Sequence, residues 1–320
     1  MNKTKIIIDC DPGYDDAVAL LLAAGTPNIE ILGITTVAGN QSLEKVTKNA
    51  LRIATLIGLN DVPVAAGAPR PLLRPAVKVA NYIHGESGLD GTTLPETDRP
   101  IDPRHAAQFI VETIMSEPPK TVTLVPIGPL TNIALAARLE PRIVDRVKEI
   151  VLMGGGYHIG NVAPMAEFNI ENDPEAAHIV FEEKWPITMV GLDLTYQALA
   201  TESVKERVSK IGTPVGKFLS DVLHHFSETY KRSKGLTEPP VHDPCAVAYV
   251  IDPSVIETRK APVHVEYRGQ YTSGMTVADL RRAAPADCHT QVAVKLNADK
   301  FWTLIEEATQ RLATRFEQRH

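Results

Sequence analysis

The chain alternates short runs of β-branched and other apolar residues with longer amphipathic stretches. The apolar runs predict strands at 5–8, 29–37, 62–65, 122–125, 150–153 and 187–190. Apolar positions that recur every three or four residues predict helices at 17–24, 43–57, 106–115, 173–183, 202–211, 216–230 and 299–316. Because strands and helices alternate, we expect a single α/β domain over residues 1–320. Its mostly parallel, open sheet would have a Rossmann-like core and helices on both faces.

Two polar stretches, 70–100 and 231–240, interrupt this pattern. Loops of such length inside a compact domain usually bind a ligand or cover a site. No low-complexity linker divides the chain, which favours one domain over two. In open parallel sheets, ligands bind beyond the carboxyl ends of the strands, so side chains that directly follow the predicted strands are the first candidates for a site.

Composition and charge narrow the range of partners. The formal net charge is −6 and no dense run of basic residues is present, so we expect no nucleic-acid partner. The apolar run at 6–8 is too short for a signal peptide or a membrane span, and we expect no membrane partner. The three cysteines, Cys10, Cys245 and Cys288, are widely separated and form no C-x-x-C pair, which favours free thiols in a reducing cytoplasm.

An acidic cluster directly follows the first predicted strand. It contains four carboxylates within eight residues: Asp9, Asp11, Asp15 and Asp16. Capping of the helix that we expect from Ala17 would explain one of them, Asp15 or Asp16, but not four. Carboxylates at such close quarters need a positive charge between them, and an all-oxygen ligand set favours a hard cation, calcium or magnesium. The cluster therefore predicts a metal or catalytic site.

Further polar groups follow other predicted strands. They are Asn40, the main chain around Ile127, and the glycine run 154–156 that leads to Asn161, Glu167 and Asn169. The pair His242 and Asp243 opens a helix after the long polar stretch 231–240. Each also has a simpler explanation, such as a turn for Asn40 or a helix cap for Asp243. The glycine run lacks the spacing and the following helix of a dinucleotide-binding loop. The helical residues 224–226 are expected at the surface more often than in a site.

Several blocks of the sequence together resemble the inosine-uridine preferring nucleoside hydrolase family. The blocks occur in the family's order at 9–16, 38–40, 83–88, 153–155, 166–169 and 242–244. The likeness extends from about Lys5 to Trp302, and the first block alone is highly specific. The resemblance implies an N-glycosidase that hydrolyses inosine- and uridine-type ribonucleosides to free base and ribose, for purine and pyrimidine salvage. It also implies one bound Ca²⁺ per subunit and a homodimer or homotetramer.

The resemblance further implies roles for individual residues. Calcium would be bound by the carboxylates of Asp11, Asp16 and Asp243 and by the main-chain carbonyl of Ile127, where relatives often have Thr or Val. The ribose would be held by Asp15, Asn161, Glu167 and Asn169, with Met153 beneath the sugar. Asn40 and His84 would line the site near the ribose and base, and His242 would lie closest to the leaving base. We also expect the base to be contacted by Tyr230, at the end of a predicted helix, and by the polar stretch 231–240 that follows it.

The chemistry of the reaction suits these residue types. A ribosyl transition state has cationic, oxocarbenium-like character, which a pocket of carboxylates and amide oxygens stabilises. Asp11 would act as the general base toward water, and His242 would protonate the leaving base or only form a hydrogen bond with it. Relatives often have apolar residues in place of Glu171 and Asn172, a departure that affects no predicted site residue.

Two other classes of protein also fit features of the sequence. Asp9 and Asp11 after a first strand are similar to the nucleophile pair of haloacid-dehalogenase-like phosphatases, although Pro12 and Gly13 follow where that family has Thr or Val. The second alternative is a calcium-dependent protein that binds ribose or a nucleoside without turnover. Phosphate release would identify the phosphatase, and release of free ribose would exclude the binding protein.

Overall fold

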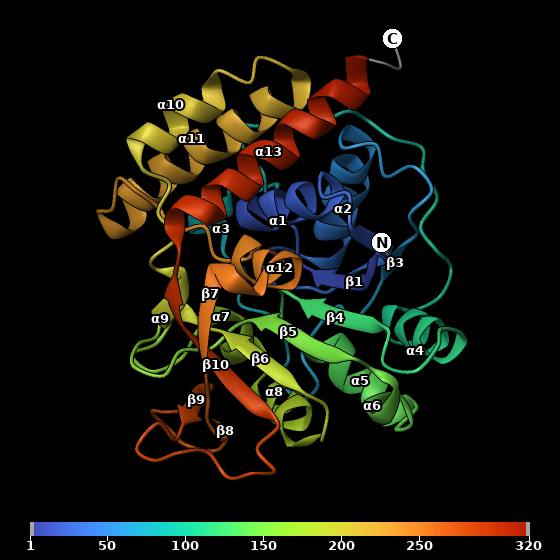
Figure 1. The fold of residues 1–320 in the computed structure, drawn as a ribbon, viewed down its shortest axis with the longest axis vertical. Helices are drawn as coiled ribbons and strands as arrows, with labels where there is room; N and C mark the ends of the chain where they lie inside the picture. Colours follow the sequence, from blue (N-terminus) through green and yellow to red (C-terminus); the bar gives the residue numbers. More distant parts are fainter. Residues whose placement is uncertain (1–2, 318–320) are drawn as a thin grey trace.

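The computed structural model describes residues 3–317, and its centre is an eight-stranded sheet of order β3-β2-β1-β4-β5-β6-β10-β7 (Figure 1). All neighbouring strands are parallel except β7, which runs antiparallel to β10. The strands of this sheet are β1 Thr4–Cys10, β2 Ile29–Thr36, β3 Val64–Ala66, β4 Val122–Pro126, β5 Glu149–Met153, β6 Ile187–Val190, β7 Ile256–Lys260 and β10 Thr290–Leu296. A separate antiparallel pair contains β8 Val263–Glu266 and β9 Met275–Ala278.

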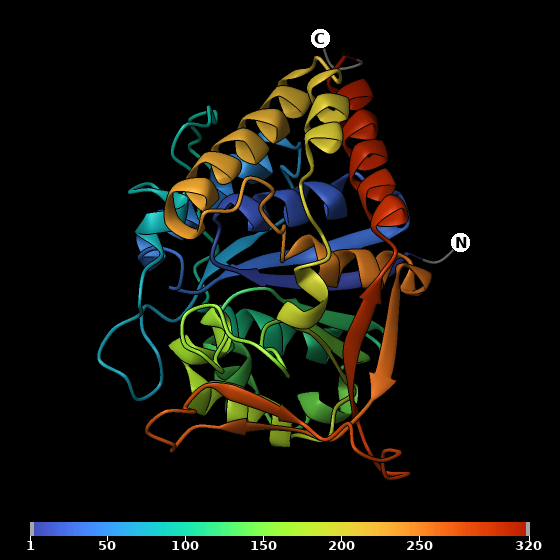
Figure 2. The same cartoon turned by 90° about the vertical axis from the view of Figure 1, so that its left-hand side faces the viewer.

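Helices cover both faces of the large sheet (Figure 2). Alternate residues of β1 face opposite layers, because successive side chains of a strand point to opposite sides. Ile6 and Ile8 belong to one core and Ile7 to the other. On the first face pack α1 Tyr14–Ala24, α2 Leu43–Leu56, α10 Glu202–Ser209, α11 Pro214–Lys234, α12 Pro244–Ile251 and α13 Ala298–Glu317. On the second face pack α4 Ala106–Ser116, α5 Thr131–Leu139, α6 Ile143–Arg146 and α8 Pro174–Glu182.

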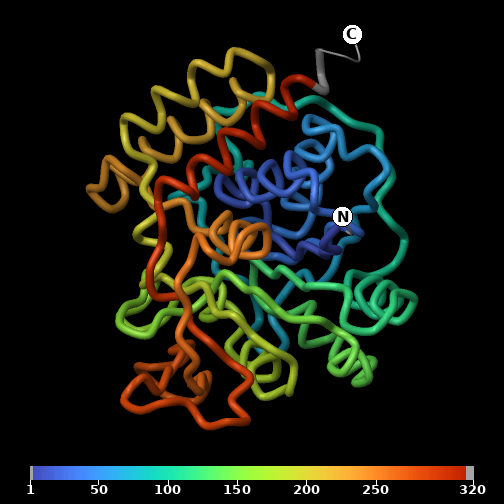
Figure 3. Tube along the Cα trace, in the orientation of Figure 1, coloured from blue at the N-terminus to red at the C-terminus, as the bar shows by residue number. Residues whose placement is uncertain are grey.

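Short elements complete the fold. They are α3 Asn81–His84, α7 Phe168–Asn172, α9 Leu192–Thr195 and the 3₁₀ turn Pro253–Val255. Although α1 and α12 are far apart in the sequence, they lie side by side, as the trace in Figure 3 shows. The predicted fold class, an α/β protein with a mostly parallel sheet covered on both faces, is therefore confirmed. In the described part of the chain, no helix combines the length and apolar character needed to span a bilayer.

The structure corrects several predicted boundaries. Helix α1 begins at Tyr14 rather than Ala17, with Gly13 as its N-cap, so Asp15 and Asp16 lie inside its first turn. Helix α11 continues to Lys234, so the polar stretch from residue 231 starts as helix and not as loop. It ends where Gly235 adopts a left-handed conformation with φ of 72°, which glycine permits without steric cost.

The four C-terminal strands were not among the predicted strands. Edge strand β7 is mostly exposed and contains polar and charged residues, so it lacks the apolar run that indicates a buried strand. Strand β10 begins with two polar residues and has a continuous apolar run of only three, Val292 to Val294, and it pairs with β6 on one side and β7 on the other. All three cysteines are free, as expected from their spacing.

Candidate active site

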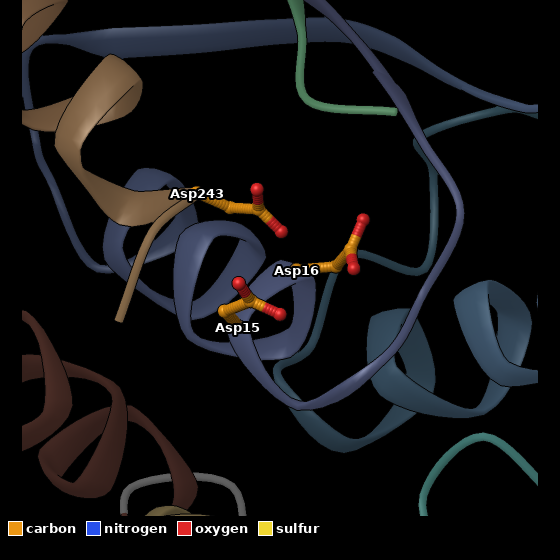
Figure 4. Close-up of side chains that lie close together, drawn as sticks. All are labelled: Asp15, Asp16 and Asp243. Atoms are coloured by element: carbon orange, nitrogen blue, oxygen red, sulfur yellow. The ribbon is translucent and has the colours of Figure 1, made fainter. Parts of the chain in front are cut away.

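Three buried carboxylates meet between α1 and α12. Asp15 and Asp16 come from the first turn of α1, and Asp243 comes from the N-cap position of α12. One carboxylate oxygen from each lies within 4.8 Å of the other two, and Figure 4 shows the three side chains projecting toward a common space. The Asp243 side chain forms no capping hydrogen bond, so helix capping does not account for it.

Asp16 is held by the turn that precedes α1. Its Oδ1 accepts a hydrogen bond from the Asp11 amide at 3.0 Å, and its Oδ2 accepts one from the Gly13 amide at 2.9 Å. The side-chain amide of Asn40 donates to Oδ2 at 3.2 Å. Asn40 follows β2, so the loop after β2 and the loop after β1 are joined at this carboxylate. The Asp16 side chain is therefore fixed in its orientation before any ligand arrives.

The Asp11 carboxylate is closely surrounded by Gly39 and Gly128, and a larger residue at either position would collide with it. Its Oδ2 accepts a hydrogen bond from the Asn40 amide at 2.6 Å, whereas its buried Oδ1 has no hydrogen-bond partner. A Cβ atom on Gly39 would lie 2.1 Å from Oδ2, and one on Gly128 would lie 2.7 Å from Oδ1. Because a buried carboxylate oxygen without a partner is costly, Oδ1 is a candidate metal ligand or proton acceptor.

The carboxylates of this cluster carry like charges and repel one another when they are ionised. Burial, followed by the neighbouring charge of Asp16, raises the pKa of Asp15 to about 7. Burial and neighbouring carboxylates also raise the pKa of Asp11 and of Asp243 well above the usual range. Carboxylates this close cannot all stay ionised without a compensating cation. The donor set contains only oxygen, which suits a hard divalent cation.

Beside the carboxylates is a cavity that opens to solvent and is lined by both polar and aromatic residues. Eleven residues predicted from the sequence line it: Asp15, Asn40, His84, Ile127, Met153, Asn161, Glu167, Asn169, Tyr230, His242 and Asp243. Asp11 and Asp16 do not line the cavity, but both accept hydrogen bonds from Asn40, which lines it. The structure thus brings most predicted site residues together at the carboxyl ends of β1, β2, β4 and β5, and at the N-termini of α1, α7 and α12. His84 comes instead from α3, and Tyr230 from the C-terminal part of α11.

One side of the cavity is built by amide and carboxylate groups. Asn169 Nδ2 donates to the main-chain oxygens of Ile127, at 3.0 Å, and Met153, at 3.1 Å, and so connects the loops after β4 and β5. Glu167 accepts hydrogen bonds from the amides of Gly155 and Asn169, both at 2.9 Å. Burial nevertheless raises the pKa of Glu167 to about 7. Hydrogen bonds therefore connect Glu167, Asn169 and Ile127, all of which line the cavity.

The other side is aromatic and contains two neutral histidines. His242 is hydrogen-bonded through Nδ1 to the Thr195 hydroxyl at 2.7 Å and through Nε2 to the Tyr230 hydroxyl at 3.1 Å. Burial lowers the pKa of His242 to about 4. Burial, with the neighbouring His242, lowers the pKa of His84 to about 3, and its Nδ1 accepts a hydrogen bond from the Tyr14 amide. His84 is thus neutral at pH 7, with its hydrogen on Nε2.

Several lining residues were not predicted as site residues. They are Ala80, Tyr82, Ile83, Val162, Phe168, Phe226 and Lys234. Phe226 lies four residues before Tyr230, so the two share one face of α11, and their ring centroids are 4.9 Å apart. The four-residue spacing from Tyr230 is the sequence pattern that could have identified Phe226 as a site residue. His224, by contrast, is exposed, in line with the expected surface position.

The fold and the cavity define a small-molecule α/β enzyme with an acidic site suited to a cation. Over residues 6–303 the chain matches the sequence profile of the inosine-uridine preferring nucleoside hydrolases. It is 58% identical over 309 residues to the inosine-uridine preferring nucleoside hydrolase of Leishmania major, covering 96% of this chain and 98% of that protein. A pyrimidine-specific ribonucleoside hydrolase of Escherichia coli is 44% identical, with 97% and 98% covered. Among solved structures, a purine-preferring ribonucleoside hydrolase from Gardnerella vaginalis aligns with a TM-score of 0.91 at 35% identity, with 97% and 99% covered.

The chain belongs to the inosine-uridine preferring nucleoside hydrolase family. It is an N-glycosidase that hydrolyses ribonucleosides. The resemblance inferred from the sequence blocks is confirmed. Membership in a family of nucleoside hydrolases decides against the phosphatase and against a binding protein without turnover.

Proposed function

We propose that this protein hydrolyses inosine- and uridine-type ribonucleosides in a calcium-dependent reaction that releases free base and ribose for nucleoside salvage in the cytoplasm. The proposed active form is a homodimer or homotetramer. The observation that carries the proposal is the set of buried carboxylates, Asp11, Asp15, Asp16 and Asp243, beside a cavity with neutral histidines and aromatic rings. Free-ribose detection on a panel of inosine, adenosine, guanosine, uridine and cytidine tests it, and no ribose from any of them would refute it.

The cation would be held by the carboxylates of Asp11, Asp16 and Asp243 and by the main-chain oxygen of Ile127. The unpartnered Asp11 Oδ1 and the close approach of Asp16 to Asp243 support this fit. When bound, calcium supplies a positive charge that lets the carboxylates stay ionised, and it lowers the pKa of water. The side chain of Asp15 belongs to the same group of carboxylates, but we assign it to the ribose hydroxyls and not to the cation.

Asp11 is the proposed general base. Its free Oδ1 would accept a proton from water as the water oxygen forms a bond to the anomeric carbon. The bond from that carbon to the base nitrogen breaks, and its electron pair leaves with the base. Carboxylates near the sugar stabilise the positive charge that develops on the ribosyl group. The base then takes up one proton, which balances the proton released by water.

The ribose hydroxyls are the proposed partners of Asp15, Asn161, Glu167 and Asn169, with Met153 beneath the sugar. We expect kcat/KM for 2′-deoxyuridine to be lower than for uridine by a factor on the order of 10⁴, because a site built for a hydroxyl leaves buried groups unpaired when the hydroxyl is missing. Parallel initial-rate measurements on the two nucleosides check this. The base is the same in both, so a difference below tenfold would contradict the assignment.

His242 is the proposed proton donor to the leaving base; because burial keeps its imidazole neutral at pH 7, it has to take up a proton during the reaction before it can donate one. We expect His242→Ala to lower kcat on inosine or uridine by about 10²–10⁴, the usual contribution of a general acid. Turnover of p-nitrophenyl riboside should stay near normal, because nitrophenolate is a stable anion and needs no proton. Steady-state kinetics on these substrates measure the difference.

The exposed His224 provides the matched control for this experiment, since His224→Ala changes the same residue type outside the cavity. Equal losses on all substrates would show that His242 positions Asp243 or Tyr230 instead, and the acid role would have to be abandoned.

A further inference from the structure

Lys234 introduces a positive charge at one end of the cavity. Of the described residues that line it, Lys234 is the only lysine or arginine, whereas Asp15, Glu167 and Asp243 contribute carboxylates. Lys234 occupies the last turn of α11 and is exposed, while the carboxylates are buried. The cavity is therefore electrically polarised, with a negative inner part and a cation at its opening.

Three separate segments meet at this ammonium group. Lys234 Nζ donates a hydrogen bond to the main-chain oxygen of Asn161 at 3.1 Å and lies 5.9 Å from the ring centroid of Tyr82. A lysine ammonium has three hydrogen-bond donors and no acceptor. The bond to Asn161 uses one donor, so others are available for a molecule in the cavity.

The polarity of the cavity orients a nucleoside. This step rests on the proposed function, which places the ribose against the buried carboxylates. The base then extends toward the opening, and its leading edge is the one opposite the glycosidic nitrogen. At that edge inosine and uridine have a carbonyl oxygen, whereas adenosine and cytidine have an amino group. In that orientation, the group in which these nucleosides differ points toward the end of the cavity where Lys234 lies.

We propose that Lys234 is a specificity-determining residue that binds the carbonyl oxygen on the distal edge of the base and selects oxo-bases over amino-bases. An ammonium group donates to a carbonyl oxygen but meets only donor hydrogens on an amino group. As the glycosidic bond breaks, its electron pair moves into the base and is shared with that oxygen in hypoxanthine and uracil. The contact therefore strengthens in the transition state, where it raises kcat/KM.

The test compares kcat/KM in two substrate pairs, inosine with adenosine and uridine with cytidine. In Lys234→Met, we expect the inosine/adenosine and uridine/cytidine ratios to fall by about tenfold or more, the scale of a hydrogen bond to a charged group. Lys234→Arg keeps the charge and the donors, so its ratios should stay close to those of the unaltered protein. Purine riboside has only hydrogen at the distal position and serves as the reference substrate, whose kcat/KM should not change.

Lys231→Met is the matched control, because Lys231 lies in the same last turn of α11 and does not line the cavity. If Lys231→Met changed the ratios as much as Lys234→Met, the effect would come from net charge and the proposal would fail. Unchanged ratios in Lys234→Met would also refute it. An equal loss on purine riboside and on all four nucleosides would show that Lys234 only holds Asn161. Failure of the unaltered protein to release ribose from any nucleoside would instead refute the proposed function.

Discussion

Asp11→Asn is expected to lower kcat on every nucleoside by more than about 10²–10⁴, the effect of losing a general base alone. The change replaces a proposed metal ligand as well as the proposed base, so the two losses act together. An asparagine amide cannot accept the proton from water. The variant keeps the volume of the side chain, which matters because Gly39 and Gly128 leave no additional space around it.

Steady-state kinetics on inosine and uridine, together with the bound-metal content of the variant, measure this effect. Asp221→Asn is a suitable control, since Asp221 pairs with Lys217 on α11 and does not line the cavity. Retention of more than a tenth of normal turnover by Asp11→Asn would refute the assignment of Asp11.

Removal of the divalent cation is the second change with a large expected effect. Extensive chelation should abolish ribose release, and calcium should restore it. Without a cation, Asp11, Asp15, Asp16 and Asp243 repel one another, and some must take up protons, as their raised pKa values indicate. The free energy of unfolding should also decrease, by about 4 kcal/mol relative to a solution with calcium at a thousand times its Kd.

Elemental analysis of the purified protein, activity after chelation and the melting temperature with and without calcium check this prediction. Magnesium added in place of calcium is the control for the identity of the ion. Absence of any divalent ion, with full activity after chelation, would overturn the proposed cofactor.

Residues that follow strands could be predicted from the sequence because the carboxyl ends of parallel strands share one edge of the sheet. Asp11 after β1, Asn40 after β2 and Met153 at the end of β5 all meet there. The close approach of Asp243 to Asp15 and Asp16 could not be derived from local patterns, since it depends on the packing of α12 against α1. Local pattern made Asp243 one of several candidates, and the resemblance to a family assigned it to the metal site.

Lys234 and Tyr82 illustrate what the sequence does not reveal, although the stretch 231–240, which contains Lys234, was expected near the base. Lys234 lines the cavity because α11 continues one turn beyond Tyr230, and the polar residues 231–234 have no apolar pattern that would indicate this extension. Tyr82 lies in a long polar stretch, where one turn of helix, α3, turns it toward the opening. Both positions depend on contacts between segments that are distant in the sequence.

The packing of α12 against α1 also determines when the site can form during folding. Asp15 and Asp16 belong to the first helix of the chain, and Asp243 lies after most of the sheet has been made. Contacts between such distant segments carry a loop-closure entropy that has to be overcome before they become favourable. A chain still emerging from the ribosome therefore has the α1 carboxylates but no third carboxylate opposite them. Acquisition of the cation would therefore report that α12 has docked against α1.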